Sequence, residues 1–239
     1  MGVARWTRIV VGVTTLIVVE SLVLGLSIVP TLALVRFLLD VLLPLAGRYG
    51  GVVLLGFIAV PAYLTFSIAL IFLTATATRL FRWRSTEGHY PLAELPWPVI
   101  RWAQYNAASH VVRLLVGTAL RATPLWTWFL RLNGARMGRD VHVNTLSIYD
   151  HNLLRFGDHV VVGSDVKLSS HVVEGGKLWI APVVFGNEVT IGTNSIVQPG
   201  VVAEDGARVG TLSLVPKGMR LEAGKLYGGV PVQVIHAEA

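Results

Sequence analysis

The chain has 239 residues, of which 53% are hydrophobic and 14% are charged, a balance too apolar for an ordinary soluble domain. It contains no cysteine, which excludes disulfides, thiol catalysis and a cysteine-based metal site. The formal net charge of +6 could favour nucleic acid, but the arginines flank apolar segments, where anionic lipid explains them more simply. We therefore predict no nucleic-acid partner.

Two long apolar runs occupy the front of the chain. Residues Ile9 to Val29 are interrupted by a single glutamate, and residues Val52 to Ala75 contain no charged side chain. About 20 apolar residues are needed to cross a bilayer, so the runs predict two transmembrane helices within residues 1–84. Segment 30–46 between them is too short to cross easily. It either extends the first helix past its proline or lies in the membrane interface.

The first run could also be a cleaved signal peptide, since Arg5 and Arg8 give it a basic start. It is longer than a typical signal-peptide core and no small-residue cleavage pattern follows it, so we predict a membrane anchor. Basic residues flank the outer ends of both runs, whereas only Arg48 lies in the short link that follows segment 30–46. The positive-inside rule therefore predicts a multi-pass cell-membrane protein with both ends in the cytoplasm.

Residues 85–133 mix aromatic and basic side chains. Four tryptophans and four arginines occur between Pro91 and Asn133, a composition that suits the headgroup region of a membrane. Apolar residues recur at near-helical spacing from Val111 to Leu120, which predicts an amphipathic linker helix. This helix either rests on the membrane or packs on the following domain as an N-terminal cap.

A strict six-residue apolar repeat fills much of residues 134–239. Its apolar positions are Trp179, Phe185, Ile191, Val197, Ala203, Val209 and Val215. Neither a helix nor a strand has this period, whereas six-residue repeats are typical of a β-helix in which three hexads close one triangular coil. We therefore predict a mainly β chain, in which two transmembrane helices and the linker helix precede a parallel β-helix prism.

The repeat slips twice, and each slip lies beside a histidine. Its earlier apolar positions are Met137, Val143, Tyr149, Phe156, Val162 and Leu168. One extra residue precedes Phe156, close to His151, and a longer insertion follows Leu168, close to His171. We expect this insertion to be a loop outside the prism, because loops can place side chains that a rigid scaffold cannot.

Histidine is the first candidate for a catalytic base, because the chain has no cysteine and no evident carboxylate pair. Five of the seven histidines lie outside the prism or alternate with valines and are expected to face solvent: His89, His110, His236, His142 and His159. His151 and His171 remain as candidates, the alternative being that each is a corner residue of an inert prism. No standard ligand spacing links the histidines, so we predict no metal site.

Three segments of the prism form an ordered series of hexads. They are Val162–His171, Phe185–Gly192 and the ending Gly228–Ile235. Together they resemble the maltose and galactoside O-acetyltransferases, a branch of the hexapeptide acyltransferases, over about residues 134–235. The resemblance implies a left-handed coil, a homotrimer and an acyl-coenzyme A co-substrate. It also implies that His171, which precedes the insertion, is the catalytic base.

A second resemblance covers more of the chain. The two apolar runs, the aromatic and basic linker, the opening Leu132–Arg139 and the segment Gly210–Pro216 are similar to one repeat of the membrane region of poly-lysine-synthetase-type peptide synthetases. In those proteins the prism is thought to join aminoacyl groups delivered on a carrier protein. The resemblance therefore implies a donor that is either a coenzyme A thioester or a phosphopantetheine thioester on a separate carrier protein.

The resemblances imply roles for five further residues. Asn144 and Asp150 would contact the acceptor, although both residue types are also common turn formers. Thr193, Thr211 and Lys217 would contact the donor, although a lysine at a coil corner is often only solvated. Thr211 stands where the acetyltransferases normally have alanine, so it narrows the cleft in which the pantetheine arm lies.

The sequence thus predicts a membrane-anchored acyltransferase that moves an acetyl or aminoacyl group from a thioester to a hydroxyl or amine. The expected partners are membrane lipid, a small-molecule or lipid-linked acceptor, further copies of the chain in a homotrimer, and a carrier protein if one holds the donor. Two alternatives remain open at this point. The chain could be the free-standing condensing subunit of a synthetase, or a trimeric membrane scaffold without catalysis.

Overall fold

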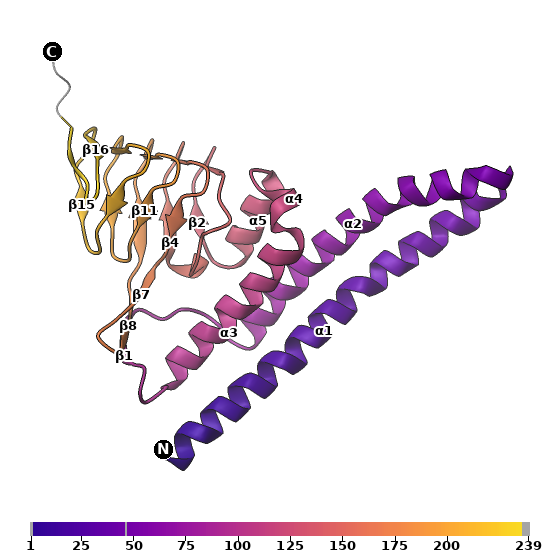
Figure 1. Cartoon of the computed structure of the whole chain (residues 1–239), viewed down its shortest axis with the longest axis horizontal. Coiled ribbons are helices and arrows are strands. Elements are labelled where there is room, and N and C mark those ends of the chain that lie inside the picture. Colours follow the sequence, from indigo (N-terminus) through magenta and orange to yellow (C-terminus); the bar gives the residue numbers. More distant parts are fainter. Residues whose placement is uncertain (1, 46, 236–239) are drawn as a thin grey trace.

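The structure is a computed structural model that describes residues 2–45 and 47–235. Within these ranges it describes every side chain except those of residues 47–49. A long helical hairpin lies along one side of the molecule, a β-helix stands opposite, and shorter helices lie between them (Figure 1). His236, one of the histidines expected outside the prism, lies beyond the described residues.

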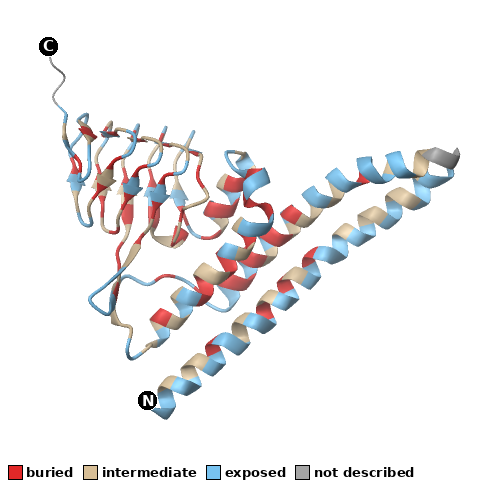
Figure 2. Ribbon diagram, in the orientation of Figure 1, coloured by how far each residue is buried: buried red, intermediate tan, exposed pale blue. Residues whose placement is uncertain are grey.

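The hairpin consists of α1, Val3–Leu42, and α2, Gly47–Leu80. Helix α1 continues through Pro30 to Leu42, so the segment after the proline extends the first helix and does not form a separate interfacial element. Both helices are long and apolar enough to cross a membrane, and only 17% and 11% of their most apolar windows are buried. Figure 2 shows exposed residues along most of the hairpin. Such an extended exposed apolar surface is uncommon on soluble monomers.

The linker folds into one strand and a run of short helices. These are β1 Gly88–Pro91, α3 Trp97–Val112, a π-helical turn Arg113–Gly117, α4 Thr118–Leu120 and α5 Pro124–Leu132. Helices α3 and α5 each have a proline in the first turn, where its missing N–H costs nothing. The linker helices lie between the hairpin and the β-helix (Figure 1).

The linker helices cap the β-helix. Trp126, Phe129 and Leu130 of α5 are fully buried in the same apolar core as the inward residues of the prism. The Trp126 indole N–H donates a hydrogen bond to the backbone oxygen of Thr145, at 3.0 Å. Helix α5 therefore packs on the prism, although its Trp128 remains 53% exposed. In the predicted amphipathic stretch, Leu114 and Leu115 are 69% and 42% exposed, whereas Val112, Val116 and Leu120 are buried.

Residues 136–234 form three sheets whose strands within the coils pair in parallel. One sheet contains β2 Arg136–Met137, β4 Leu154–Phe156, β9 Val183–Phe185, β12 Val202–Ala203 and β15 Arg220–Leu221. The second contains β3 His142–Val143, β5 Val161–Val162, β10 Thr190–Ile191, β13 Arg208–Val209, β16 Leu226–Gly228 and the antiparallel β17 Gln233–Val234. The third contains β6 Lys167–Leu168, β11 Ile196–Val197 and β14 Leu214–Val215.

The register of these strands confirms the predicted coil. Thr190 pairs with Arg208 and Ile196 pairs with Leu214, so neighbouring coils are offset by three hexads. The predicted apolar positions from Phe185 to Val215 are all buried inside the prism. A parallel β-helix with three sides therefore follows from the repeat, as expected from the period of six.

Two residues that the repeat predicts inside the prism, Tyr149 and Trp179, do not occupy inward positions. Ile148 is fully buried and bridges to Leu168, so it takes the inward place predicted for Tyr149. Trp179 lies in β8, Lys177–Ile180, outside the prism. In β8 the buried Leu178 and Ile180 alternate with the more exposed Lys177 and Trp179, which is the period of two of a strand. Trp179 stands six residues before Phe185 in the sequence, but it does not occupy a position of the coil.

The insertion after Leu168 is an ordered β-hairpin, which corrects the expected loop. Strand β7, His171–Glu174, pairs antiparallel with β8, and β1 of the linker adds a third strand on the other side of β8. Gly175 and Gly176 join the strands with φ of +55° and +72°, as a two-residue turn between paired residues requires. The hairpin therefore starts at His171 and fixes that residue at the edge of the prism.

Candidate active site

His171 and Asp150 form a hydrogen-bonded pair at the start of the hairpin. The Nδ1 atom of His171 lies 2.5 Å from Oδ2 of Asp150, and Ser169 Oγ lies 3.1 Å from the same nitrogen. A carboxylate can only accept, so Nδ1 carries the proton and Nε2 is left with a lone pair in the neutral ring. The His171 side chain is 22% exposed, whereas that of Asp150 is fully buried. This is the arrangement of a base oriented by a buried acid.

Asp150 is held by groups from outside the prism. Ser85 Oγ donates to Oδ1 of Asp150 at 2.5 Å, and Asn106 Nδ2 donates to the same oxygen at 3.3 Å. Burial alone would raise the pKa of Asp150, but the hydrogen bonds from His171, Ser85 and Asn106 outweigh it and hold that pKa below its ordinary value. Asp150 is therefore ionised at neutral pH and can stabilise a protonated His171.

His151, the other candidate base, is fully buried and both of its ring nitrogens are occupied. Nε2 lies 3.2 Å from the backbone oxygen of Ile148, so it is the protonated nitrogen, and Nδ1 accepts a hydrogen bond from the Tyr105 hydroxyl at 2.8 Å. Burial and the positive charge of Arg113 lower the pKa of His151 to about 4. A neutral ring without exposed surface supports the site and does not reach a substrate.

Aromatic side chains surround the exposed part of His171. Trp102 of α3 meets its ring edge-on at 4.9 Å between centroids, and Tyr149 does so at 5.9 Å. Arg113 lies over the Tyr149 ring at 4.5 Å and donates to the backbone oxygen of Ile148 at 3.1 Å. The indole N–H of Trp102 is buried without a partner among the described residues. His171 therefore lies against two aromatic rings, one of which has a buried indole N–H.

The structure divides the remaining predicted site residues between two corners of the prism. Asn144, Thr193 and Thr211 follow β3, β10 and β13 of one sheet, so they lie along one corner, which we call the first corner. Thr193 and Thr211 are on consecutive coils, where the Leu212 N–H donates to the Thr193 carbonyl at 2.9 Å. No described contact joins the first corner to His171 within one chain.

Lys217 lies along the second corner, the one that carries Asp150 and His171. It follows β14 and forms an ion pair with Glu174 at the end of β7. Its ammonium is 5.9 Å from the centre of the Trp179 ring, which stacks on His89 of β1 at 5.5 Å. Lys217 is thus already paired in this structure, and its availability to a donor phosphate depends on release from Glu174.

Several groups in the site were not predicted from the sequence. Ser85, Trp102, Tyr105, Asn106 and Arg113 all come from the linker, and they contact residues of the second corner. No repeat or motif connects these positions to the prism, because their place depends on how the linker packs on it. Among the described residues, no group of three histidine, aspartate or glutamate side chains gathers as a metal site requires.

Comparisons with known proteins agree with this fold. The chain is 28% identical over 155 residues to the delta-poly-L-ornithine synthetase of Acinetobacter baumannii, covering 64% of the chain and 12% of that protein. It is 32% identical over 107 residues to the galactoside O-acetyltransferase of Escherichia coli, covering 41% of the chain and 52% of that enzyme. The predicted family resemblance is confirmed. The chain spans about half, or less, of the length of the curated relatives it matches.

Solved hexapeptide-repeat acetyltransferases are also similar to the chain. One from Vibrio cholerae, solved with acetyl coenzyme A, is 21% identical with a TM-score of 0.39, over 43% of this chain and 60% of that one. A maltose O-acetyltransferase from Clostridium difficile is 16% identical with a TM-score of 0.43, over 56% of this chain and 86% of that one. No protein-family model matches the chain.

Proposed function

We propose that the chain is a membrane-anchored acyltransferase that uses His171 as its base. The observation that carries the proposal is the 2.5 Å pairing of His171 with the buried, ionised Asp150 at the edge of a hexapeptide prism. The relatives include enzymes named as acetyltransferases, which supports acyl transfer as the reaction. We take the coil to be left-handed, as the resemblance implies, and residues 1–84, 85–133 and 134–239 to be the anchor, the linker and the transferase domain.

In the proposed reaction, Nε2 of His171 removes the proton from an acceptor hydroxyl or amine as its oxygen or nitrogen attacks the thioester carbonyl carbon. The carbon–sulfur bond then breaks, and the thiolate leaves with the proton that His171 took. Asp150 stabilises the imidazolium formed in between. Backbone N–H groups at the coil corners are candidates to stabilise the developing oxyanion.

The donor in this proposal is a coenzyme A thioester or a phosphopantetheine thioester on a carrier protein. In a homotrimer, the first corner of one prism would face the second corner of its neighbour, so Asn144, Thr193 and Thr211 of one chain would complete the site of another. The two apolar helices support anchoring in the cell membrane with the prism on the cytoplasmic side. A lipid-linked acceptor would then reach His171 from the membrane surface.

Replacement of His171 by alanine tests the proposal. With purified full-length chain in detergent, acetyl coenzyme A and a panel of hydroxyl and amine acceptors, we expect release of free thiol to fall about 10²- to 10⁴-fold. His142→Ala, which changes an exposed histidine on β3, is the matched control and should keep full activity. Thiol release that is unchanged in His171→Ala would exclude this base. No turnover of any thioester by the unaltered chain would favour the trimeric scaffold.

A second candidate function is peptide-bond formation by a free-standing condensing subunit. The similarity to a poly-ornithine synthetase covers 64% of this chain and includes more of it than the acetyltransferase similarity does. The chemistry at His171 would be the same, with an amine as acceptor and an aminoacyl thioester as donor. Mass spectrometry of ligand that co-purifies with the chain would distinguish an acetyl product from an aminoacyl product.

A further inference from the structure

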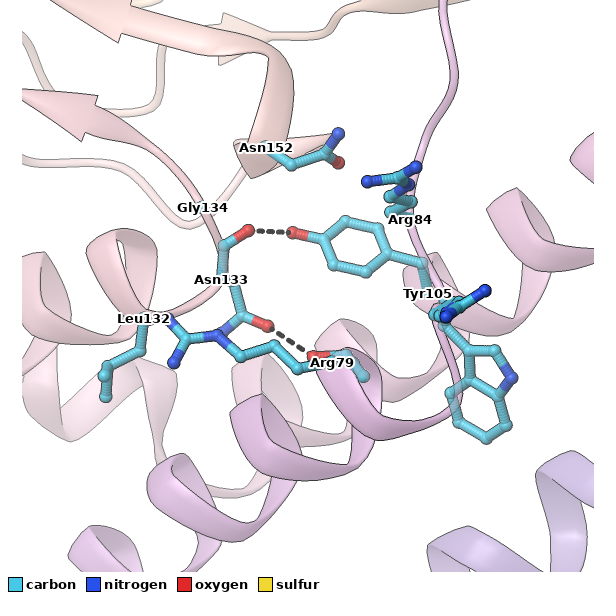
Figure 3. Close-up of a pocket in the computed structure, with 10 residues that line it drawn as sticks. Arg79, Arg84, Tyr105, Leu132, Asn133, Gly134 and Asn152 are labelled. Atoms are coloured by element: carbon cyan, nitrogen blue, oxygen red, sulfur yellow. Dashed lines mark hydrogen bonds between the residues drawn. The ribbon is translucent and has the colours of Figure 1, made fainter.

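A pocket of about 460 Å³ lies where the linker meets the end of α2 and the start of the prism. Its wall combines the end of α2, the segment after it, α3, the end of α5 and the turn at Asn152 (Figure 3). The lining residues are Thr78, Arg79, Arg82, Trp83, Arg84, Tyr105, Leu132, Asn133, Gly134 and Asn152. Three of these ten side chains are arginines, and none is acidic.

The three arginines are exposed, and none of them has an ion-pair partner among the described side chains. None of the ion pairs between described side chains includes Arg79, Arg82 or Arg84. Like charges that line one pocket repel each other unless an anion lies between them. In the sequence these arginines are explained by the positive-inside rule alone, but that rule does not require them to converge on one pocket.

Arg82 occupies a backbone position that normally favours glycine. It has φ of +54°, directly after helix α2, and the Arg82 and Trp83 N–H groups donate to the carbonyls of Arg79 and Thr78. This is the Schellman helix ending, whose left-handed residue is usually glycine because a side chain is strained there. An arginine in that place costs stability, and the cost is offset if its guanidinium binds a ligand.

The same hydrogen bonds at the helix end satisfy carbonyls that would otherwise repel an anion. Helix C-termini carry partial negative charge, so an anion is unfavourable there unless the carbonyls are capped and cations lie close by. Both conditions hold at this end of α2. Neutral polar groups complete the wall. The Tyr105 hydroxyl lies 3.3 Å from the Asn133 carbonyl (Figure 3), and the Thr78 hydroxyl lies 3.3 Å from Oδ1 of Asn133.

One residue connects the pocket to the catalytic pair. Ser85 follows Arg84, donates through its hydroxyl to Asp150, and exchanges backbone hydrogen bonds with the Asn152 side chain at 3.2 and 2.8 Å. Asn152 lines the pocket, and Asp150 holds His171. A group bound by the arginines would therefore be connected to Asp150 through Ser85 and Asn152.

We propose that this pocket binds a phosphate or pyrophosphate group. The arginine fork matches two phosphate oxygens at once, and three uncompensated guanidiniums suit a dianionic group better than a single carboxylate. The phosphate belongs either to a lipid headgroup, brought there by the adjacent apolar hairpin, or to a soluble phosphate ester. This inference concerns binding alone, so it does not depend on the proposed acyl transfer.

Two titrations of the full-length chain distinguish these sources. In the first, inorganic pyrophosphate is titrated by calorimetry into chain held in phosphatidylcholine nanodiscs. In the second, nanodiscs that contain phosphatidylglycerol are compared with pure phosphatidylcholine nanodiscs, and the lipid that stays bound is counted by native mass spectrometry. Saturable binding in the first titration supports a soluble phosphate ester, and retained phosphatidylglycerol in the second supports a headgroup.

Two variants test the assignment of residues. Arg82→Gly and Arg84→Gln should each weaken the binding that is observed by about tenfold or more, the effect of losing one charge-assisted contact. Because glycine suits the left-handed position, Arg82→Gly should also unfold at the same temperature as the unaltered chain or higher, which separates lost binding from lost folding. Arg155→Gln removes an exposed arginine on β4 and should leave binding unchanged.

The proposal is overturned if neither pyrophosphate nor phosphatidylglycerol binds above background. It is also overturned if Arg155→Gln weakens binding as much as Arg84→Gln does, since the effect would then be one of net charge. Either outcome leaves the acyltransferase proposal untouched, because thiol release by His171 is measured separately.

Discussion

Asp150 and His151 are neighbours in the chain and both are fully buried, yet they have different charges at neutral pH. The pKa of each is below its ordinary value, which leaves the carboxylate charged and the imidazole neutral. Asp150 receives three hydrogen bonds that favour its charged form, whereas His151 has burial and a nearby arginine that disfavour its charge. The carboxylate that pairs with His171 is thus charged, and the histidine next to it in the chain is neutral.

This difference predicts a pH dependence of stability. The pKa of His151 is about 4 in the folded chain and near its ordinary 6.5 when unfolded, so the unfolded state binds more protons between those values. Stability from this residue is complete above about pH 6.5 and is lost as the pH falls towards 4, by roughly 3 kcal/mol in all. Thermal unfolding of the chain in detergent from pH 7.5 to 4.5 measures this.

The variant His151→Asn removes the titrating ring and should flatten the change in melting temperature over that pH range. His142→Asn is the control, because His142 is exposed on β3 and its replacement should leave the slope as it is. A His151→Asn chain that loses stability on acidification as steeply as the unaltered chain would contradict the assignment. The pH dependence of the melting temperature would then come from other titratable groups.

At the scale of elements, the period of six was enough to predict the prism but not the site. The inward residues from Phe185 to Val215 were predicted because each coil repeats one local rule, that a first-position side chain points inward. Trp179 was misplaced because an antiparallel hairpin follows a different period. The pairing of His171 with Asp150 depends on two coils stacking in register, which the slips in the repeat obscure.

The linker contribution could not be predicted from the sequence for a physical reason. Asn106 and Tyr105 reach the site through the packing of α3 between the hairpin and the prism, and Ser85 reaches it from the segment after α2. This packing is a tertiary interaction among elements that are far apart in the chain, and an amphipathic pattern only says that a helix has a buried face. The pattern left membrane and prism as alternatives for that face. Leu114 and Leu115 on the predicted face are exposed, whereas Val112, Val116 and Leu120 join the core.

One glycine sets how closely α1 approaches α3. A Cβ at Gly12 would lie 2.6 Å from Cγ2 of Ile100, and the Gly12 carbonyl accepts a hydrogen bond from Gln104 Nε2 at 2.9 Å. Gly12→Leu should therefore force the helices apart and lower the free energy of unfolding by about 1–3 kcal/mol. Gly25→Leu is a matched control on the same helix, since a Cβ there meets no atom within 4 Å.

The two variants are compared by melting temperature in detergent and by thiol release, because α3 also carries Trp102 beside His171. We expect Gly12→Leu to lower both, and Gly25→Leu to lower neither. Equal melting temperatures for the two variants would show that the α1–α3 crossing does not stabilise the linker. Site geometry would then be independent of the hairpin.

For the whole molecule, the main question is whether one chain holds a complete site. Asn144, Thr193 and Thr211 line the first corner, while Asp150, His171 and Lys217 line the second, on separate edges of one rigid prism. A close-packed protein interior is stiff, so the prism does not bend to bring its edges together. If both corners serve one reaction, they must belong to different copies, as cyclic oligomers with a heterologous interface allow.

Mixing two inactive variants tests this arrangement. His171→Ala damages the second corner and Thr211→Trp fills the first, so each alone should release little thiol. In trimers assembled from equal amounts of both, about a quarter of the interfaces combine an intact second corner with an intact first corner, and about a quarter of full activity should return. A mixture of His171→Ala with Asp150→Asn is the control, because both lie on the second corner and no interface is restored. Native mass spectrometry checks that mixed trimers form, and mixed trimers that stay inactive would mean that each chain completes its own site.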